Sequence, residues 1–530
     1  MVKKKQVIQS GAWQMLNVSV KVFSQFAYYG VMARLLSKSE LGIFALLNSF
    51  MNFGNMLGDG GMGDALLQRK EIEKRHVNAA FYSSLLLAVI IYGAVYVLAP
   101  WAADFYKEPQ LTSSLRIFSV IFLFAAMYSA SFAQLQRKFA FKKIFVADGI
   151  MLLLSNILGI VLAYNGYGFM SLVWSQIFYF GAEMILLLYY APIPLKLGAT
   201  KQHWKDLIGY GTGLTFIRLN TYIVNFGIVL EVGKLVTAAV LGVFDRSFRI
   251  MNIPQRFLYD MVQRVMMPAM VKKNDGEKGT FVVFSKTLSL INTGLIPLTL
   301  FLILFSKPIV LILLGKKWLE AVPLLQIFFL NLPLRTTASL GDTLMRVHGY
   351  IKLNLIRKIQ NSVIIIALIY IGYVLKDFCV AHSTPTGKDN IPQLYGIAWG
   401  IFISTFISYL MMMAIIKRRI FPADWKKLVF KPYYNGVLLA ICGVLPCLLA
   451  YYGLHYFIKD DIIAFCVLCA VAGLTGLYLF IKKPKVLGSD IAYIQADFLQ
   501  MFKKKKQKGK HKTAAATARN GTTNNIEREA

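Results

Sequence analysis

Charge, and negative charge above all, is scarce in this sequence. Only 16% of its 530 residues are charged, whereas 57% are hydrophobic, and 58 Lys and Arg stand against 26 Asp and Glu. A soluble protein carries charge on about a quarter of its residues, so this composition argues against a soluble fold. A net charge of +32 would suggest nucleic acid in a soluble chain, but in a membrane protein such an excess collects in cytoplasmic loops. We therefore predict a polytopic membrane protein with no nucleic-acid partner.

Cysteine, histidine and catalytic motifs are scarce too. Four of the five cysteines, Cys442, Cys447, Cys466 and Cys469, fall in apolar runs, so they predict no disulfide framework. Because no histidine lies near the last two, we interpret that Cys-x-x-Cys pair as packing and not as a metal site. The six histidines form no pair at metal-ligand spacing, and no P-loop, G-x-S-x-G or H-E-x-x-H motif occurs. We expect no catalytic residue, no metal and no bound cofactor, and hence no enzyme.

What the sequence does have is a series of long apolar runs. Each approaches the ~20 residues that a helix needs to cross a bilayer. Lipid satisfies no backbone polar group, so such runs must be helical. We predict an all-α protein of about fourteen transmembrane helices. The predicted spans are 11–35, 41–58, 79–100, 115–134, 145–164, 169–190, 207–230, 235–253, 281–305, 323–341, 356–375, 394–416, 433–454 and 462–481.

The distribution of positive charge predicts the orientation. With Met1 inside, most Lys and Arg fall in inner segments, including 246–286 and the tail that starts at Lys482. The N-terminal stretch is basic without a small-residue cleavage site, so we interpret it as a cytoplasmic end. Both termini are therefore predicted to be cytoplasmic. Within the inner segment, Pro254–Met270 has apolar residues at helical spacing with basic residues among them, which predicts an interfacial helix.

The chain also repeats itself at an offset of 200 residues. Leu41-Gly42-Ile43-Phe44 maps onto Leu241-Gly242-Val243-Phe244. Six spans per unit return the chain to its starting side, so the two units have parallel topology about an axis along the membrane normal. We predict an N-lobe at 1–200, a C-lobe at 201–420, two further spans at 421–482 and a basic, partly disordered tail at 483–530.

Glycine and aspartate gather at the inner end of the second span. The chain reads Gly-Asp-Gly-Gly-Met-Gly-Asp from Gly58 to Asp64. Glycine tolerates positive φ and close helix approach. A hinge or a cavity lining is therefore predicted at four positions: Gly58, Gly60, Gly61 and Gly63. Asp59 and Asp64 either cap helix ends or take part in ion coupling.

Several short motifs follow one another in a defined order along the chain. A-R-L-L-S-x-x-E-L-G-x-F-A starts at Ala33, and D-x-G-x-G-x-A-L-x-Q-R runs from Asp59 to Arg69. Gln136-Arg137-Lys138-Phe139 with Phe141 follows, and then Leu241–Phe244 with Pro254. In this order and spacing, over residues 5–480, the sequence resembles the polysaccharide-transport branch of the MOP flippase superfamily.

The resemblance implies a MATE/MurJ-like fold, with two six-helix lobes, and an exporter of the lipopolysaccharide, O-antigen or colanic-acid type. The implied cargo is an undecaprenyl-diphosphate-linked oligosaccharide. It would be turned across the bacterial inner membrane by alternating access during lipopolysaccharide, capsule or exopolysaccharide biosynthesis. The implied partners are membrane lipids and the polysaccharide polymerase machinery, and a proton or sodium gradient would drive transport.

Ionisable residues in or near the spans are the candidate site residues, because a charge at mid-bilayer costs at least a few kcal/mol and usually faces water, a partner or a substrate. For an anionic headgroup we predict binding by four cations, since Arg and Lys can replace the water around a phosphate. They are Lys21, Arg218, Arg335 and Arg34. Lys21 and Arg218 lie at comparable depths of equivalent spans, which predicts that they form a diphosphate clamp.

The candidates for ion coupling are four acids, because a carboxylate in a closing cavity can exchange its proton. They are Asp59, Asp64, Asp148 and Glu183. Alternative readings remain open: Lys21 pairs with Glu183, and Arg218 faces a helix carbonyl or water. Residues near span ends, Arg34 and Asp245 among them, are also explained by snorkelling.

Two other functions were weighed. A cation-coupled multidrug antiporter of the same superfamily would need acids to dominate the cleft, whereas the deepest charges here are mainly basic. A membrane glycosyltransferase, polymerase or ligase on the same lipid carrier would need a large outer loop or an acidic pair at the membrane face. Many relatives carry an acid in the middle of span seven, where this chain has Asn225-Phe226-Gly227. The resemblance therefore does not predict a coupling-ion site in that span.

Overall fold

The computed structural model is helical throughout the residues that it describes, which are 4–58, 61–69, 72–193, 222, 226–272, 277–375, 392–421, 431–457, 462–465 and 467. In this part of the chain, seven helices are long and apolar enough to cross a membrane. They cover 74–106, 110–137, 141–164, 170–190, 284–304, 351–374 and 392–419. The predicted all-α multi-pass membrane protein is confirmed, while the total of about fourteen spans and the repeated lobes stay predictions.

The N-terminal helices follow the predicted spans. Their bounds are α1 Lys4–Leu35, α2 Lys38–Gly58, α3 Met62–Gln68, α4 Lys74–Tyr106, α5 Gln110–Phe118, α6 Val120–Arg137, α7 Phe141–Phe145, η1 Val146–Ile150, α8 Met151–Tyr164 and α9 Met170–Tyr190. The first two predicted spans, 11–35 and 41–58, are therefore present as α1 and α2, which form a helical hairpin.

The later helices include short elements that hydropathy does not distinguish. Their bounds are α11 Ile228–Leu235, α12 Ala238–Lys272, α13 Glu277–Leu304, α14 Ser306–Leu313, η3 Lys316–Trp318, α15 Ala321–Phe329, α16 Asn331–Val347, α17 Ile351–Val374, α19 Pro392–Arg419 and α21 Lys431–Phe457. The span predicted at 323–341 is divided between α15 and α16.

The chain forms two compact units. Unit 1 comprises Met1–Leu258, Ser306–Ala338 and Gly349–Met412, and unit 2 comprises Tyr259–Phe305, Ser339–His348 and Met413–Ala530. This division does not test the predicted lobes at 1–200 and 201–420, which stay a prediction. In unit 2, α13 and α21 pack against each other.

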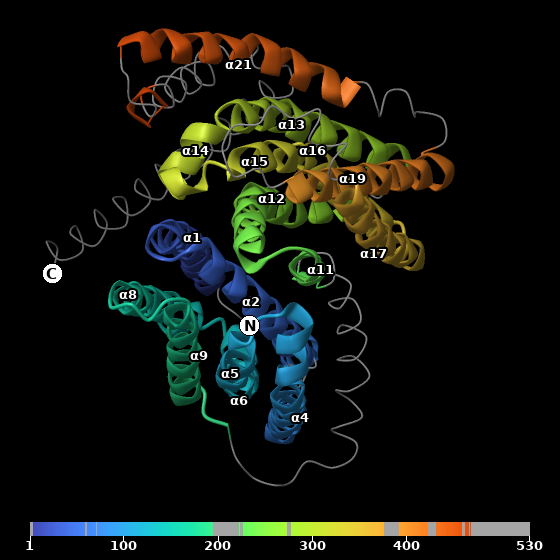
Figure 1. Ribbon diagram of the computed structural model, residues 1–530. Helices are drawn as coiled ribbons and strands as arrows, with labels where there is room; N and C mark the ends of the chain where they lie inside the picture. Colours follow the sequence, from blue (N-terminus) through green and yellow to red (C-terminus); the bar gives the residue numbers. More distant parts are fainter. Residues whose placement is uncertain are drawn as a thin grey trace, which may run out of the picture. The chain divides into compact units, whose positions relative to one another are not determined.

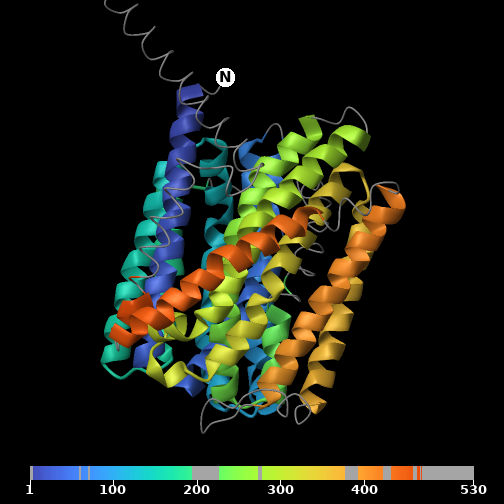
Figure 2. The same cartoon turned by 90° about the horizontal axis from the view of Figure 1, so that it is seen from above.

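Unit 1 is built from helices packed lengthwise. α1 packs along α8, α8 along α9, and α4 along α6 (Figure 1). α17 and α19 also run side by side (Figure 2). Their backbones approach so closely that a Cβ on Gly372 would meet the carbonyl of Gly396, and one on Gly396 would meet the carbonyl of Gly372.

The turn between α1 and α2 is fixed by its own side chains. The Ser37 amide donates to Glu40 Oε2 at 2.7 Å, and the Glu40 amide donates to Ser37 Oγ at 3.2 Å. This reciprocal capping box satisfies amides that the first turn of a helix leaves without partners. The Ser-x-x-Glu pattern in the sequence thus explains why the second helix of the hairpin begins where it does.

α12 is one continuous helix from Ala238 to Lys272. The sequence predicted an interfacial helix at Pro254–Met270, and the structure places this segment in the same helix as the apolar run before it. The inner-side assignment of 246–286 stays a prediction. The proline that begins the predicted interfacial helix removes only one backbone donor, and packed membrane helices tolerate this loss, as α4 and α13 also do. Arg246 and Arg249 consequently belong to a helix and not to a loop.

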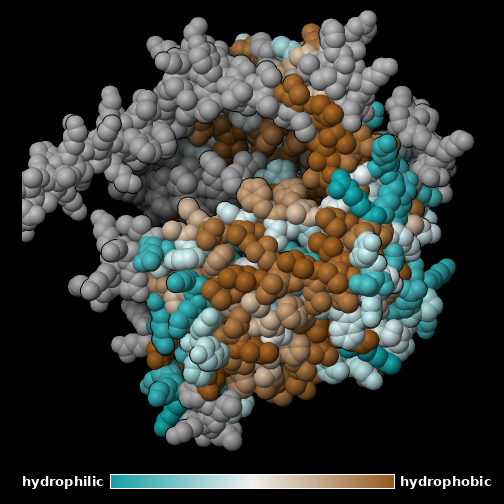
Figure 3. All heavy atoms as spheres, turned by 90° about the vertical axis from the view of Figure 1, so that its left-hand side faces the viewer, coloured by the Kyte–Doolittle hydropathy of each residue, from teal (hydrophilic) through white to brown (hydrophobic). Residues whose placement is uncertain are grey.

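The face of unit 1 over α8 and α9 is hydrophobic. Figure 3 shows a broad band of hydrophobic residues there, with hydrophilic residues gathered on both sides. Leu153, Ile157, Val161 and Ile185 on these two helices are between 40% and 63% exposed. Contiguous apolar exposure of this kind is rare on a soluble monomer but suits contact with lipid.

Candidate functional site

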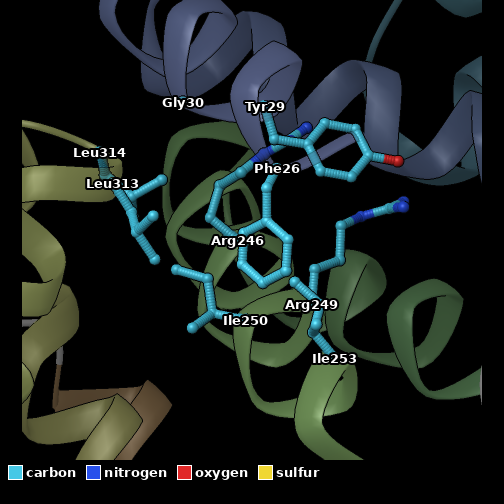
Figure 4. Close-up of a pocket in the computed structure, with 9 residues that line it drawn as sticks. All are labelled: Phe26, Tyr29, Gly30, Arg246, Arg249, Ile250, Ile253, Leu313 and Leu314. Atoms are coloured by element: carbon cyan, nitrogen blue, oxygen red, sulfur yellow. The ribbon is translucent and has the colours of Figure 1, made fainter. Parts of the chain in front are cut away.

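A pocket in unit 1 lies between α1, α12 and α14 (Figure 4). Its lining combines apolar side chains with two arginines of α12 and a tyrosine of α1. The lining residues are Phe26, Tyr29, Gly30, Arg246, Arg249, Ile250, Ile253, Leu313 and Leu314. Arg246 and Arg249 are three residues apart, so both lie on the same face of α12.

Arg246 is a buried cation without hydrogen bonds. Its side chain is only 2% exposed, and none of its three guanidinium nitrogens has a hydrogen-bond partner among the described residues. Asp245 Oδ2 lies 3.7 Å from Arg246 Nη2, and the ring of Tyr29 lies 5.2 Å from the guanidinium carbon. An ion buried in this way is strongly unfavourable unless a partner satisfies it.

The neighbouring carboxylate is already engaged by the second arginine. Arg249 Nε donates to both oxygens of Asp245, at 2.8 and 2.7 Å. Asp245 is 1% exposed, and Arg249 is the main partner of this buried acid. Two guanidinium groups thus share one carboxylate, and the cluster keeps one net positive charge beside the pocket. Such a cluster can bind an anion, and phosphate oxygens accept from guanidinium in a bidentate geometry.

Arg335, a predicted substrate-binding residue, approaches the same helix one to two turns further along. Its Nη1 donates to Asn252 Oδ1 at 3.1 Å and to Gln255 Oε1 at 2.9 Å. Its guanidinium lies 5.6 Å from the ring of Phe248. These partners are neutral, so they orient Arg335 without cancelling its charge. Phe248, Asn252 and Gln255 lie on the opposite face of α12 from the pocket residues Arg246 and Arg249, so Arg335 contacts that helix outside the pocket.

A second polar cluster, the carboxyl network, joins α1, α6, η1 and α9 in unit 1. Lys21 Nζ lies 2.5 Å from Asp148 Oδ2. Asn17 Nδ2 donates to the same oxygen at 2.9 Å, and the Tyr179 hydroxyl donates to Asp148 Oδ1 at 2.6 Å. Glu183 is buried beside them. Lys21 therefore pairs with Asp148, whereas the alternative weighed from the sequence had Glu183 as its partner.

A local break in helical geometry positions Asp148. The helix widens into the π-helical segment Val146–Ile150 between α7 and α8. Gly149 follows Asp148, and a Cβ there would lie 2.7 Å from Asn17 Oδ1. The glycine therefore lets α1 approach closely enough for Asn17 and Lys21 to reach the carboxylate. No group of three or more His, Cys, Asp or Glu that could hold a metal occurs among the described residues.

The other predicted site residues lie apart from these clusters. Arg34 Nη2 donates to the Ile312 carbonyl at 2.6 Å and is exposed. Arg218, Asp59 and Gly60 lie outside the described residues, as does the side chain of Asp64. The predicted clamp of Lys21 and Arg218 consequently stays a prediction.

The predicted hinge is described in part. Gly58 ends α2, and Gly63 lies in α3. Gly61 caps the start of α3 with a φ of 73°, which favours glycine. Nη1 of Arg137 reaches the carbonyls of Leu66, Leu67 and Arg69 at the other end of α3. Two motifs that carried the family resemblance thus contact each other.

Sequence reasoning missed Arg246 and Arg249. They were counted with the inner segment 246–286, because positive charge beyond an apolar run normally marks a cytoplasmic loop. One signal could have found them. Apolar residues recur at helical spacing through Phe244, Phe248 and Met251, so the amphipathic pattern does not stop at Asp245.

The two repeated Leu-Gly-x-Phe segments meet in unit 1. A Cβ on Gly42 would clash with the carbonyl oxygen of Ala238, and a Cβ on Gly242 would clash with that of Lys38. We call this the glycine contact. It is reciprocal, because an offset of 200 residues turns Gly42 and Lys38 into Gly242 and Ala238.

Polar contacts surround the end of the α1–α2 hairpin near the glycine contact. Lys38 forms an ion pair with Glu320. Lys317 Nζ donates to the carbonyls of Arg34 at 3.1 Å and Leu36 at 2.5 Å, and Trp318 Nε1 donates to the Ala33 carbonyl at 2.9 Å. The η3 segment therefore covers the turn of the hairpin.

Comparison with known proteins agrees with this architecture. TuaB of Bacillus subtilis, a teichuronic acid biosynthesis protein, is 23% identical over 65% of this chain and 72% of its own length. ExoT of Rhizobium meliloti, a succinoglycan biosynthesis transport protein, is 23% identical over 64% of this chain and 68% of its own. A solved structure of the lipid II flippase MurJ in an inward closed conformation has a TM-score of 0.64 at 15% identity, over 89% of this chain and 98% of that one. At that identity the likeness shows the fold alone.

The sequence profile of one family, described as polysaccharide biosynthesis protein, matches residues 31–323. That range is more than half of the chain. It contains the turn between α1 and α2, the carboxyl network except for Asn17 and Lys21, and both arginines of the pocket. The chain therefore belongs to the polysaccharide biosynthesis protein family.

Proposed function

We propose that this protein is a flippase that moves an undecaprenyl-diphosphate-linked oligosaccharide from the inner to the outer leaflet of the bacterial inner membrane. The product would feed lipopolysaccharide, capsule or exopolysaccharide biosynthesis. The family, the transport role in the name of ExoT and the flippase fold of MurJ support this conclusion. They support a transporter, and not an enzyme.

The single observation that supports an anionic cargo is the burial of Arg246 beside the pocket. A cation that is 2% exposed and has no hydrogen bond to the described residues is unfavourable in a purely structural helix. Beside a pocket it becomes a binding group, because a diphosphate oxygen satisfies the guanidinium that Asp245 leaves unsatisfied. Arg249, on the same face of α12, is the second guanidinium beside the pocket.

The proposed orientation has both termini in the cytoplasm and the glycine contact at the outer end of two lobes. The three segments that meet there, around Lys38, Ala238 and Lys317, are all assigned to outer loops or span ends by the positive-inside count. The reciprocal geometry of the contact is what a pseudo-twofold axis along the membrane normal requires. Alternating access would then open this end and release the cargo outward. A proton or sodium gradient is the proposed driving force, and polymerase machinery is the proposed recipient of the product.

Flipping in proteoliposomes tests the function. The purified full chain is reconstituted with a fluorescent undecaprenyl-diphosphate-linked oligosaccharide. The same glycan on a single phosphate is the matched cargo, and a cationic dye represents the antiporter alternative. We expect the diphosphate cargo to move at least about tenfold faster than the monophosphate, since one charge-assisted contact to phosphate is lost. Export of the dye without movement of either lipid would contradict the proposal and favour a multidrug antiporter.

Reporter fusions test the orientation. A fusion at Asp389 is expected to report the outer compartment, and a fusion at Asn524 the cytoplasm, because the excess of Lys and Arg is assigned to inner segments. Both sites lie outside the described residues. Activity of an alkaline phosphatase and a fluorescent-protein reporter at each site gives the readout. Two fusions that report the same side would remove the proposed topology and the two-lobe arrangement with it.

A further inference from the structure

The carboxyl network has more negative than positive charge. Asp148 and Glu183 are both buried, and Lys21 is the cation beside them. In the described part of the chain, the charged and titratable groups that face these acids are Lys21 of α1, Tyr128 of α6 and Tyr179 of α9. Two buried carboxylates cannot both stay charged beside a single ammonium without a further positive charge. The network therefore holds a proton or another cation in addition to Lys21 whenever both acids are buried.

The two acids are not equivalent. Asp148 accepts from Lys21, Asn17 and Tyr179, so both of its oxygens are engaged. Glu183 bonds with Tyr128, but its Oε2 is buried and has no hydrogen-bond partner among the described residues. An orphaned carboxyl oxygen at 4% residue exposure is unfavourable. Glu183 Oε2 is thus the atom best placed to take up a proton or coordinate a small cation.

Lys21 is the member of the network that can leave. Its side chain is 35% exposed, whereas that of Asp148 is 6% exposed. Its ammonium sits on a flexible stem and holds the network through one ion pair. A phosphate that approaches the exposed side of Lys21 competes directly with Asp148, because both offer anionic oxygens to the same ammonium.

We propose that Lys21 is a movable counterion, held by Asp148 in the absence of cargo and drawn to the cargo's phosphate when it binds, and that Asp148 and Glu183 then bind one monovalent cation, a proton or sodium, in its place. The proposal rests on the proposed function, since it requires an anionic cargo. Its consequence is positive coupling: the anion and the cation each raise the affinity for the other by the same factor. The network thereby links cargo binding to cation binding without any contact between cargo and ion.

Binding in lipid nanodiscs tests the coupling. The probe is undecaprenyl diphosphate capped with one sugar, whose phosphates stay ionised across neutral pH. Its affinity for the full chain is measured at several pH values in potassium, and at several sodium concentrations at fixed pH. If the cation is a proton, the affinity is expected to rise up to about tenfold for each unit that the pH falls. If the cation is sodium, it rises by a similar factor for each tenfold increase in sodium.

Variants separate this role from a structural one. Lys21→Met is expected to bind the probe more weakly and with no dependence on either ion, because no ammonium then leaves Asp148. Lys21→Met combined with Asp148→Asn, which removes both charges of the ion pair together, is expected to bind more weakly and to lose the dependence as well. Lys352→Met, an exposed lysine of α17, keeps the dependence and serves as the control. Binding that ignores both ions in the wild type, or a dependence that survives Lys21→Met, overturns the proposal. Absence of any probe binding would instead count against the proposed function.

Discussion

Replacing Arg246 by Met is expected to slow flipping severely and, at the same time, to make the protein more stable. Arg246 is a buried charge with no hydrogen bond among the described residues, and replacing buried charged groups by apolar side chains of similar volume stabilises a protein by up to about 1–4 kcal/mol. Asp245 keeps both of its bonds from Arg249, so no new unpaired charge is created. The lost contact to phosphate should lower the flipping rate by about 100-fold, as expected for charge-assisted bonds worth about 1.5–3 kcal/mol.

The measurement pairs an initial flipping rate with a melting temperature in detergent. Arg249→Met is the matched control, because it removes an arginine from the same face of α12 but leaves buried Asp245 with Arg246 alone, at 3.7 Å. It is expected to lower the melting temperature, whereas Arg246→Met raises it. Arg246→Lys should recover only part of the flipping rate, since an ammonium lacks the planar fork of guanidinium. Normal flipping by Arg246→Met would exclude this arginine from the binding site.

Hydropathy was sufficient to predict the helices because a bilayer leaves the backbone no alternative. The apolar runs at 11–35 and 41–58 correspond to α1 and α2, and the Ser-x-x-Glu pattern between them marks the start of the second helix. The same reasoning failed beyond 246. It treats every arginine past an apolar run as solvated, and it has no means of detecting that a cation is enclosed by neighbouring helices. The continuous helix α12 exposes that limit.

Contacts between distant segments could not be predicted from the sequence. Lys21 was selected as a deep charge, but its pairing with Asp148 depends on a π-helical turn and on the small residue Gly149. Neither feature has a sequence period that could be recognised in advance. The repeated Leu-Gly-x-Phe segments were visible at an offset of 200 residues. That they touch each other could not be predicted, because periodicity states which segments are equivalent and not which are adjacent.

The glycine contact leads to the second large prediction: Gly42→Ala and Gly242→Ala are each expected to destabilise the protein by about 1–3 kcal/mol, as overpacking of a tight contact does. Each added methyl group would meet a backbone carbonyl, of Ala238 or of Lys38, and a carbonyl cannot rotate away as a side chain can. Gly93→Ala in α4 is the control, because a Cβ there meets nothing within 4 Å. Alanine has the higher helix propensity, so this variant should be neutral or stabilised by up to about 1 kcal/mol.

The double variant tells whether the two glycines act as one contact. Since both methyl groups force apart the same pair of helices, the first substitution already separates them and the second should add little. The double variant is therefore expected to lower the melting temperature by clearly less than the sum of the two single variants. Such non-additivity is the signature of directly coupled residues. If the contact closes the outer end during transport, the same 1–3 kcal/mol shifts the balance of closed and open states by about 5- to 150-fold, and flipping falls accordingly. Additive losses of stability with unchanged flipping would show that the glycine contact is ordinary helix packing. The outer end would then be closed by contacts on the Lys38–Glu320 side of the hairpin.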